Sequence, residues 1–493
     1  MLGIGGAGLS GAARLLLAQG HRVSGHDRCK SPFASALRDL DVVVEFGESA
    51  AAAIPHGAEL VVRSAAIPDS DPQVLEARER GLPVWKYAQL LGRLGPARRT
   101  MAVAGTHGKT TSAWMLYHAL AGVARLTGGP SPGALVGGTD VAMGTNALAP
   151  GAGTDSDFIP RPGRDSGIGS SSAGVREATS GWFAVEACEY DRTFLQLGPE
   201  AAIVTNVEAD HLDYYGSLEA VESAFARFLD RVHPDGLVVC GRDVPERVTH
   251  AAAPRVWRMG HELHIDSLSE EHGCHEFRLR GPGWATPALR LCVPGEFNVE
   301  NAALAIALAV GLAGGDHDPG ALAKAAAESL SNFRGVERRF ESWFRHGDVE
   351  VIHDYAHHPT EVRVNIEAAR RRAPDRPVHV LFQPHQHSRT ARFLSDFVDA
   401  LRHAHAVVVT DVYGARVQID SQAAGAEELV RQLHLARVKA SFGGPAIEAG
   451  EVLVRGLPDA CTVLVLGAGD IDGIRDDLEE RLAVRGAATC TAS

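Results

Sequence analysis

The sequence lacks a hydrophobic run long enough to cross a membrane, and its longest run, residues 302–313, is better explained as a buried helix. The chain starts with a glycine-rich turn, Gly3-Ile-Gly-Gly-Ala-Gly8, where a secretion signal would have a hydrophobic core. Basic charge is also scarce, because 48 basic and 61 acidic side chains give a formal net charge of −13. We therefore expect no membrane insertion and no nucleic acid as the main partner, while a local basic site for phosphates remains compatible with this charge.

Cysteine is sparse as well, with seven residues and no C-x-x-C pair. A zinc site or a disulfide framework would show cysteines at characteristic close spacings. We therefore expect reduced thiols in a cytoplasmic protein. The seven are Cys29, Cys188, Cys240, Cys274, Cys292, Cys461 and Cys490.

A chain of 493 residues is too long for one hydrophobic core, and its length favours about three domains. Strand-like and helix-like segments alternate, so we expect an α/β fold. The domains expected are a Rossmann-like N-terminal domain (1–98), a central domain like a P-loop ATPase with a mainly parallel sheet (99–331) and a Rossmann-like C-terminal domain (332–493). Residues 149–180 are rich in Gly, Ser, Asp and Pro, which predicts a flexible insertion without an assigned function.

Short apolar runs that end at glycine or polar residues mark the expected strands. The first strand is nearly missing, because only Met1 and Leu2 precede Gly3. We expect either a natural start a few residues upstream or a truncated strand. The other strands are expected at 22–25, 41–46, 59–63, 182–186, 201–205, 236–240, 349–352, 378–382, 406–410 and 462–466.

Residues 101–111, Met-Ala-Val-Ala-Gly-Thr-His-Gly-Lys-Thr-Thr, have the pattern of a phosphate-binding loop that follows an apolar strand. Gly105 and Gly108 let backbone N–H groups approach phosphate oxygens, Lys109 adds positive charge, and the Thr110 hydroxyl can ligate Mg²⁺. A helix that starts here would point its N-terminal dipole at the same anion. The loop is two residues shorter than the usual G-x-x-x-x-G-K-[ST], and a structural strand–helix turn is the alternative.

Two further polar residues follow predicted strands of the central domain. Glu186 ends the strand at 182–186, and His211 closes the segment Thr205-Asn-Val-Glu-Ala-Asp-His211. Ligands bind at the carboxyl ends of strands in open α/β sheets. Carboxylate and imidazole groups beside a phosphate loop favour Mg²⁺ ions that bridge substrate and γ-phosphate. The alternative is a set of polar residues that cap helices or line a cleft.

In the C-terminal domain, two polar segments each directly follow a predicted strand. They are His353-Asp-Tyr-Ala-His-His-Pro-Thr-Glu361 and Gln383-Pro-His-Gln-His-Ser-Arg-Thr390. Within the second, Arg389 can pair bidentately with a carboxylate. Arg338 and its neighbour Arg339, near the second domain boundary, can clamp phosphates. A solvated surface remains the alternative for the histidines and for these two arginines.

Taken in order, these segments resemble the signatures of the Mur ligases, the ATP-dependent amide-forming enzymes of peptidoglycan precursor synthesis. The resemblance runs from Gly3 to about Gly473 and is broken at 149–180. So many motifs in one order are far more specific than any single loop. The motifs are 105–111, Gly144-Thr-Asn146, 205–211, Asn298-Val-Glu-Asn301, 354–361, 382–385 and Arg389-Thr390.

The resemblance implies the alanine-adding reaction of the family. ATP would phosphorylate the lactyl carboxylate of UDP-N-acetylmuramate, and the amine of L-alanine would then attack the acyl phosphate and expel phosphate. Positioning and charge neutralisation do most of the work in phosphoryl transfer. The implied cofactors are ATP and Mg²⁺, the implied partners are UDP-N-acetylmuramate and L-alanine, and we expect a monomer or a homodimer.

The resemblance also implies roles for individual residues. The catalytic groups would be Lys109, His211, Asp354 and His357. ATP would bind at Gly105, Thr106, His107, Gly108, Lys109, Thr110, Thr111, Asn298, Asn301 and Arg338. The UDP-linked substrate would bind at Gly3, Gly5, Gly8 and Asn146. Mg²⁺ would bind at Thr110, Glu186 and His211. The incoming amino acid would meet His357 and Arg389.

Some positions depart from the family pattern, namely Cys188, Glu296, Phe297 and Gln386. Cys188 removes an acid but leaves Glu186 in place, and Gln386 leaves Arg389 as the expected carboxylate clamp. Phe297 offers a ring for stacking on adenine where an imidazole is usual. Residues 110–323 contain no lysine, so a carbamylated lysine cannot hold Mg²⁺, in agreement with the alanine-adding branch.

Three alternatives remain open. A recycling ligase would join a preformed tripeptide to UDP-N-acetylmuramate, although 383–385 with Arg389 favours a small amino acid. An NAD-dependent dehydrogenase would read a ribose with Asp27 but would leave the phosphate loop unexplained. A non-catalytic nucleotide-binding relative would explain the departures. The residues that argue against this last alternative are Lys109, Thr110, Glu186, His211 and Asp354.

Overall fold

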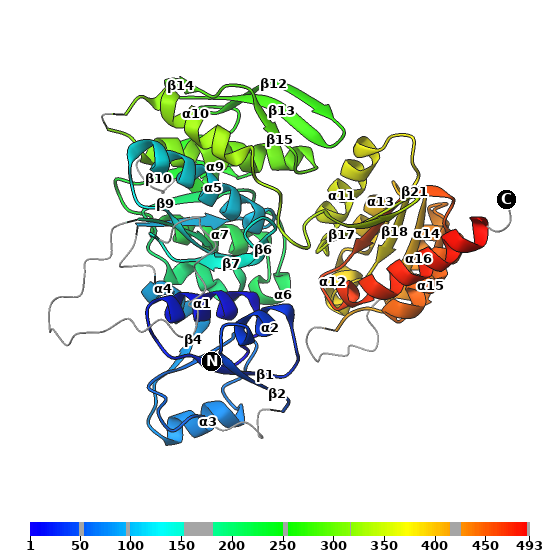
Figure 1. The fold of residues 1–493 in the computed structure, drawn as a ribbon, viewed down its shortest axis with the longest axis horizontal. Coiled ribbons are helices and arrows are strands. Elements are labelled where there is room, and N and C mark those ends of the chain that lie inside the picture. Colours follow the sequence, from blue (N-terminus) through cyan, green and yellow to red (C-terminus); the bar gives the residue numbers. More distant parts are fainter. Residues whose placement is uncertain are drawn as a thin grey trace. The chain divides into compact units, whose positions relative to one another are not determined.

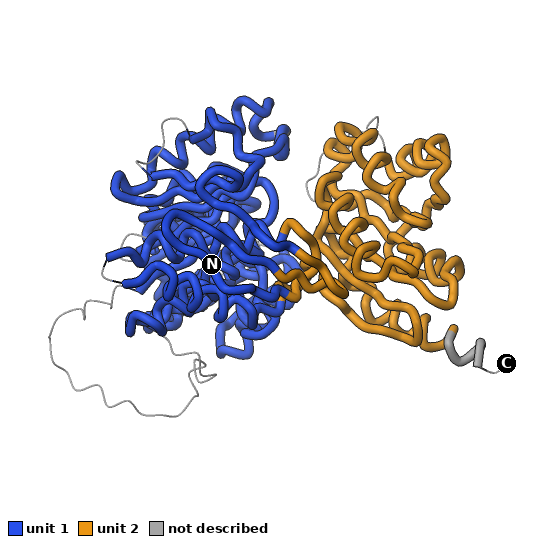
Figure 2. The backbone as a smooth tube through the Cα atoms, turned by 90° about the horizontal axis from the view of Figure 1, so that it is seen from above, with its two compact units in different colours: residues 1–268, 277–291, 298–334 blue, residues 269–276, 292–297, 335–493 orange. Residues whose placement is uncertain are grey.

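The computed structural model describes most of the chain. The described residues are 1–48, 54–94, 99–151, 181–249, 255–315, 317–414 and 425–490, so the predicted insertion at 149–180 lies outside them except for its first three residues. The chain divides into two compact units, coloured separately in Figure 2. Unit 1 comprises 1–268, 277–291 and 298–334, and unit 2 comprises 269–276, 292–297 and 335–493.

Strands and helices alternate along the chain, as Figure 1 shows. The strands are β1 (Ser24–Asp27), β2 (Val43–Phe46), β3 (Val61–Arg63), β4 (Val84–Lys86), β5 (Arg99–Ala104), β6 (Gly133–Asp140), β7 (Thr145–Leu148), β8 (Trp182–Glu186), β9 (Ala201–Val204), β10 (Leu237–Cys240), β11 (Val256–Arg258), β12 (His264–Glu271), β13 (Cys274–Gly281), β14 (Trp284–Ala285), β15 (Leu289–Leu291), β16 (Glu341–His346), β17 (Asp348–Asp354), β18 (Val378–Phe382), β19 (Ala406–Thr410), β20 (Ala440–Gly444) and β21 (Ala460–Leu466). The helices are α1 (Ala7–Ala18), α2 (Pro32–Arg38), α3 (Pro72–Glu79), α4 (Tyr87–Leu94), α5 (Lys109–Thr127), the 3₁₀ helix η2 (Tyr190–Gln196), α6 (Leu212–Tyr215), α7 (Leu218–Leu229), α8 (Glu246–Thr249), α9 (Glu296–Leu312), α10 (Pro319–Leu330), α11 (Pro359–Arg372), α12 (His387–Arg392), α13 (Leu394–Leu401), α14 (Ala426–Leu435), α15 (Ala446–Gly456), the 3₁₀ helix η3 (Ile471–Ile474) and α16 (Arg475–Cys490).

The N-terminal part of unit 1 contains two parallel strand pairs, β1 with β2 and β3 with β4. Leu2 joins the pairs, because it forms parallel bridges to both His26 and Arg63. The expected first strand is therefore reduced to a single bridging residue, directly before the glycine motif.

A mainly parallel sheet of seven strands, in the order β11-β10-β9-β5-β8-β6-β7, forms the centre of unit 1. Only β6 and β7 pair antiparallel among these strands. Helices α1 and α4 pack their apolar residues into the same core as this sheet, including Leu9, Leu15 and Leu91. The N-terminal and central parts share one hydrophobic core for this reason, and they form one compact unit.

Unit 2 contains a six-stranded sheet in the order β16-β17-β21-β18-β19-β20, with β16 antiparallel to β17 and the other pairs parallel. Alternate residues of a strand point to opposite faces. Phe382 packs with α11, α13 and α14 on one face, whereas Leu381 packs with α15 and α16 on the other. Both faces of the sheet are covered, as parallel sheets require. The prediction of an α/β fold with mainly parallel sheets is confirmed.

The structure corrects the expectation of reduced thiols throughout. Cys274 and Cys292 form a disulfide, although they are 18 residues apart in the sequence. Cys274 begins β13, Cys292 directly follows β15, and β13 pairs with β15, so sheet pairing brings the two cysteines together. The remaining cysteines described as free are Cys29, Cys188, Cys240 and Cys461.

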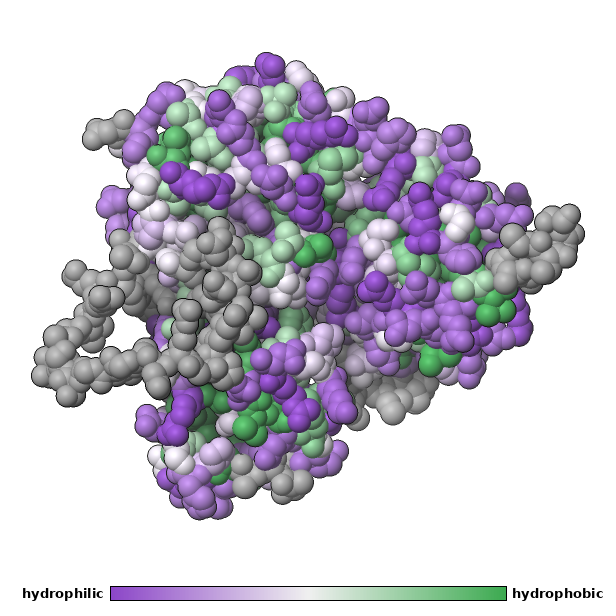
Figure 3. Space-filling model, in the orientation of Figure 1, coloured by the Kyte–Doolittle hydropathy of each residue, from purple (hydrophilic) through white to green (hydrophobic). Residues whose placement is uncertain are grey.

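The surface and the helices agree with the absence of long hydrophobic runs. On the face drawn in Figure 3, hydrophilic residues predominate, and apolar residues lie in small groups between them. None of the helices in the described ranges combines the length and hydropathy of a membrane span.

Candidate active site

The predicted phosphate loop connects β5 to the start of α5. Its two glycines adopt positive φ angles, 145° at Gly105 and 78° at Gly108, and Gly108 is the N-cap of α5. A Cβ atom on Gly105 would lie 1.9 Å from the hydroxyl oxygen of Thr205, so only glycine fits there. The loop therefore passes closely over the end of β9 before α5 begins at Lys109.

Hydrogen bonds hold the phosphate loop to the predicted segment 205–211. The amide of Thr106 donates to the carbonyl oxygen of Asn206 over 3.1 Å, and the amide of His107 donates to Asn206 Oδ1 over 2.8 Å. In return, the amide of Glu208 donates to Thr106 Oγ1 over 2.8 Å. The ends of β5 and β9 meet here because the two strands are neighbours in the parallel sheet.

Lys109 is folded over its own loop and paired with Glu189. Its ammonium group donates to the carbonyl oxygens of Gly105 and Thr106 over 2.7 and 2.9 Å, and Nζ lies 3.0 Å from Glu189 Oε2. Burial is the largest single influence and would lower the pKa of Lys109, but the neighbouring acidic groups, led by Glu189, together outweigh it, and the pKa is raised above its ordinary value. The lysine is therefore charged at every physiological pH.

Two of the three predicted metal ligands are in contact. Thr110 Oγ1 donates to Glu186 Oε1 over 3.1 Å, and the second carboxylate oxygen of Glu186 accepts from the amide of Gly137 over 2.6 Å. A hydroxyl and a carboxylate oxygen at this separation, beside a phosphate loop, form the oxygen-rich donor set that Mg²⁺ prefers. The residues present therefore fit this ion.

The third predicted ligand, His211, lies beside Glu189. Its Nε2 atom is 3.7 Å from both Glu189 Oε1 and Asp210 Oδ2, and its ring centre is 5.1 Å from that of Tyr190. The residue has a φ of 52° and caps α6, so its backbone is held in a conformation that few non-glycine residues adopt. Glu189 thus contacts both Lys109 and His211.

Sequence reasoning gave Glu189 no role. Its side chain is 3% exposed, and its carbonyl oxygen accepts a 2.6 Å hydrogen bond from the Tyr215 hydroxyl. The only sequence signal was a second acid three residues after Glu186. Asp191 and Arg192, which follow Tyr190, have positive φ angles of 51° and 53° and redirect the chain shortly after Glu189.

Cys188 and Tyr87 are two further residues on which the charge of Glu186 acts. Burial, assisted by the Glu189 carboxylate, raises the pKa of the Cys188 thiol to about 12, so this departure from the family pattern introduces a neutral group. Burial and then the charge of Glu186 also raise the pKa of Tyr87. A Cβ atom on Gly8 would lie 2.8 Å from the phenol ring of Tyr87. One phenol therefore contacts the N-terminal glycine motif and is also influenced by the charge of Glu186, and no sequence pattern indicated it.

The predicted UDP-binding residues gather at the start of α1. Gly3 has a φ of 77°, and the amide of Gly5 donates to Asp27 Oδ2 over 2.8 Å. Asn146 of β7 is 1% exposed and donates to the carbonyl oxygen of Ala7 over 2.7 Å. Residues from the N-terminal and central parts are thus brought to one helix start.

The two predicted asparagines of α9 lie against the phosphate loop. Asn301 Nδ2 donates to Asn298 Oδ1 over 3.1 Å, and both side chains are buried. A Cβ atom on Gly108 would lie 3.0 Å from Asn301 Oδ1. The amides therefore lie at the loop that the sequence assigned to ATP.

In unit 2, His385 brings the two residues predicted for the amino acid together. The ring centres of His357 and His385 are 5.5 Å apart, and Arg389 Nη1 lies 3.2 Å from His385 Nδ1. The His385 ring also stacks on Tyr413 at 5.8 Å. His385 lay within the segment 383–390, but sequence reasoning gave it no role of its own.

Asp354 and Arg338 make mainly structural contacts within unit 2. The two carboxylate oxygens of Asp354 accept 2.7 Å hydrogen bonds from the amides of Phe340 and Ala356, and burial raises its pKa to about 6. The guanidinium of Arg338 lies 4.8 Å from the Tyr355 ring centre. Arg338 belongs to unit 2, whereas the phosphate loop belongs to unit 1.

Comparisons with known proteins cover nearly the whole chain. Residues 1–99 match the profile described as Mur ligase family, catalytic domain, residues 103–309 match the Mur ligase middle domain, and residues 338–469 match the Mur ligase, glutamate ligase domain. The UDP-N-acetylmuramate–L-alanine ligase of Rubrobacter xylanophilus is 37% identical, covering 98% of this chain and 99% of that protein.

Solved structures of two ligases also match nearly the whole chain. The UDP-N-acetylmuramate–alanine ligase of Thermotoga maritima superimposes with a TM-score of 0.76 at 26% identity, covering 98% of each chain. A murein peptide ligase of Psychrobacter arcticus gives a TM-score of 0.69 at 21% identity, with 98% of each chain covered, which shows a shared fold.

Proposed function

The chain belongs to the Mur ligase family, and from this premise we propose that it joins L-alanine to the lactyl carboxylate of UDP-N-acetylmuramate at the expense of ATP, in peptidoglycan precursor synthesis. One observation carries the proposal: a curated ligase with this activity in its name is 37% identical over 98% of the chain. The γ-phosphoryl group would pass to a carboxylate oxygen and ADP would leave. The alanine amine would then attack the acyl carbon, and phosphate would leave as the amide forms and the amine loses a proton.

The geometry of unit 1 supports the ATP half of this reaction. The first backbone amides of α5, from Lys109 to Thr111, would hold the phosphates, and Lys109 would neutralise charge on the transferred group. Glu189 orients this lysine through the 3.0 Å ion pair. Asn298 and Asn301, which lie against the loop, would contact the nucleotide.

Thr110 and Glu186 would hold Mg²⁺, and His211 would complete the set beside Glu189. When bound, the ion would polarise phosphoryl oxygens and offset their negative charge. Cys188 is a neutral thiol near Glu186. The negative charge that would balance Mg²⁺ therefore comes from the carboxylate of Glu186.

We assign the other two substrates to separate parts of the chain. The UDP-linked substrate would bind in 1–98, at Gly3, Gly5 and Gly8, with Asn146 contributed by the central part 99–331. L-Alanine would bind in 332–493, where Arg389 would pair with its carboxylate and His357 would lie beside the reacting amine. We infer a cytoplasmic location, since the reaction consumes ATP, and a monomer or homodimer, which light scattering would distinguish.

The test is phosphate release from ATP and Mg²⁺ in the presence of UDP-N-acetylmuramate, with either L-alanine or the tripeptide L-Ala-γ-D-Glu-diaminopimelate as the acceptor. Release that depends on L-alanine supports the proposal. Release with the tripeptide alone would assign the chain to cell-wall recycling instead. No release with either acceptor, from protein that binds ATP and is folded, would indicate a non-catalytic relative.

A further inference from the structure

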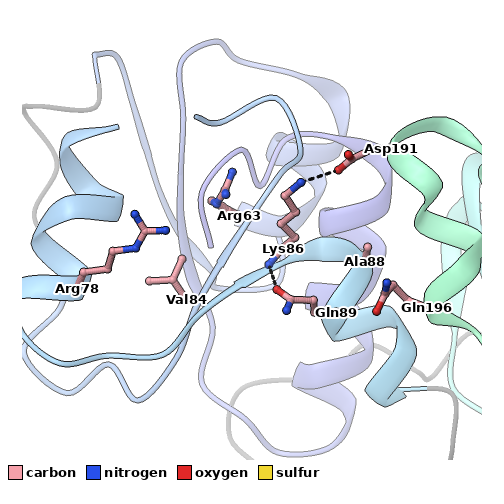
Figure 4. A pocket seen from close by; sticks show the side chains of 8 residues that line it. All are labelled: Arg63, Arg78, Val84, Lys86, Ala88, Gln89, Asp191 and Gln196. Atoms are coloured by element: carbon pink, nitrogen blue, oxygen red, sulfur yellow. Dashed lines mark hydrogen bonds and ion pairs between the residues drawn. The ribbon is translucent and has the colours of Figure 1, made fainter. Parts of the chain in front are cut away.

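A cavity of about 380 Å³ opens at the ends of β3 and β4, where no substrate or cofactor has been assigned (Figure 4). Its polar lining consists of Arg63, Arg78, Lys86, Gln89, Asp191 and Gln196. In Figure 4, Arg63 and Lys86 lie between Arg78 on one side and the η2 residues Asp191 and Gln196 on the other. The volume is within the range of small-molecule sites, and three of the six polar side chains are cationic.

The two central cations are placed side by side by the sheet. Arg63 and Lys86 end their strands and are direct partners in the parallel register of β3 and β4. Like charges in this arrangement repel each other. Asp191 offsets part of this repulsion, because its carboxylate lies 2.9 Å from Lys86 Nζ. The Arg63 side chain is only 7% exposed, so its charge is held in place by the fold.

The two arginines converge on a single oxygen atom. Arg63 Nη2 lies 3.0 Å from Asp69 Oδ1, and Arg78 Nη2 is paired with the same atom. Asp69 is 66% exposed, whereas Arg63 is buried, so the carboxylate is the partner that can be displaced. Two guanidinium groups around one oxygen anion form the arrangement by which arginines bind phosphate oxygens.

The cavity is linked to the glycine motif through the residues that follow Arg63 and Lys86 in the sequence. Ser64, which follows Arg63, would be 3.0 Å from a Cβ atom on Gly3, and Tyr87, which follows Lys86, packs on Gly8. The chain as a whole carries a net charge of −13, so a group of three cations here is not part of a generally basic surface.

We propose that this cavity binds a phosphate group, with Arg63 and Arg78 exchanging the Asp69 carboxylate for phosphate oxygens and Lys86 supplying a third positive charge. The phosphate can come from two sources, the diphosphate of the UDP-linked substrate or a separate phosphorylated small molecule. Anion binding itself does not depend on which reaction the chain catalyses, so its failure is distinguishable from failure of the proposed function.

The experiment titrates inorganic pyrophosphate into the full-length protein by calorimetry, with the ATP site saturated by MgADP. Arg78→Ala is the test variant, because the Arg78 side chain is 50% exposed and its loss leaves the core unchanged. Arg38→Ala is the matched control, since it removes the same charge from an exposed position of α2 in the same domain. We expect Arg78→Ala to weaken pyrophosphate binding at least tenfold, and Arg38→Ala to leave it unchanged.

The KM values for UDP-N-acetylmuramate and ATP distinguish the sources. If Arg78→Ala also raises the KM for UDP-N-acetylmuramate while the KM for ATP is constant, the bound phosphate is that of the substrate. If both KM values are constant while pyrophosphate binding is lost, the ligand is a separate anion. Equal pyrophosphate binding by wild type, Arg78→Ala and Arg38→Ala, or no binding by the wild type, would overturn the proposal.

Discussion

Lys109 and Glu189 form a buried ion pair, with Nζ 3.0 Å from Oε2 and the glutamate side chain 3% exposed. The pair joins the phosphate loop to the segment after β8. The second oxygen of the same carboxylate lies 3.7 Å from His211 Nε2, so one buried acid orients two residues predicted to act in catalysis.

Replacing Lys109 by alanine removes both a phosphate ligand and the partner of Glu189. We expect Lys109→Ala to abolish turnover and to lower the free energy of unfolding by about 3–5 kcal/mol, because a buried charge is left unpaired. The double variant Lys109→Ala/Glu189→Gln should regain stability without regaining turnover. Urea unfolding and phosphate release measure the two effects, and a near-normal rate in the single variant would contradict the ATP assignment.

Arg389 should act on the amino acid and not on ATP. We expect Arg389→Ala to raise the KM for L-alanine by about tenfold or more, the loss of roughly one charge-assisted hydrogen bond, and to change the KM for ATP little. Arg392→Ala is the matched control, because Arg392 is an exposed arginine of the same helix, α12. Equal increases in both KM values for Arg389→Ala would remove Arg389 from the amino-acid site.

The raised pKa of Asp354 predicts a pH dependence of stability. The folded protein holds this proton up to about pH 6, whereas an unfolded aspartate releases it near pH 3.9. The folded state therefore binds more protons in this window, and the free energy of unfolding falls as the pH rises through it, by roughly 3 kcal/mol from this group.

Asp354→Asn lacks this titration. The difference in free energy of unfolding between the variant and wild type should therefore shift in favour of the variant as the pH rises from 4 to 7. This holds even though one of the amides of Phe340 and Ala356 loses an acceptor in the variant. Chemical unfolding of both proteins across this range provides the measurement. Parallel pH profiles would show that Asp354 does not titrate in this window.

Gly8→Ala should disturb the contact between the glycine motif and Tyr87. The added Cβ atom would lie 2.8 Å from the phenol ring, which forces a shift that costs about 1–3 kcal/mol. Tyr87→Leu in the same chain should relieve the overlap. Gly57→Ala is the control, because an added Cβ there meets no atom within 4 Å. Thermal unfolding gives the comparison, and equal melting temperatures for Gly8→Ala and Gly57→Ala would refute the close contact.

The sequence alone was sufficient to predict strands whose positions are decided by the local residue pattern. The expected strands at 182–186, 378–382 and 406–410 match β8, β18 and β19, because short apolar runs with polar ends leave few other options. The approach of the phosphate loop to 205–211 also followed from the rule that parallel strands end at one edge of a sheet.

The residues that were missed depend on tertiary structure. Glu189 reaches Lys109 from a segment in which Asp191 and Arg192 adopt positive φ angles, and two such residues in succession, one of them an arginine, are not signalled by the sequence. Tyr87 meets Gly8 only because α1 and α4 pack into one core. Cys274 and Cys292 meet through the pairing of β13 with β15, which an irregular cysteine spacing does not reveal.

The bond between Cys274 and Cys292 closes residues 274–292 into a covalent ring. Trypsin cleavage within the ring, at exposed Arg278, Arg280 or Arg290, would leave the two halves of the chain joined by sulfur. Such a nicked protein would migrate as a single chain without thiols and as two fragments after reduction. A gel that omits or includes reductant therefore gives different answers about the integrity of the same sample.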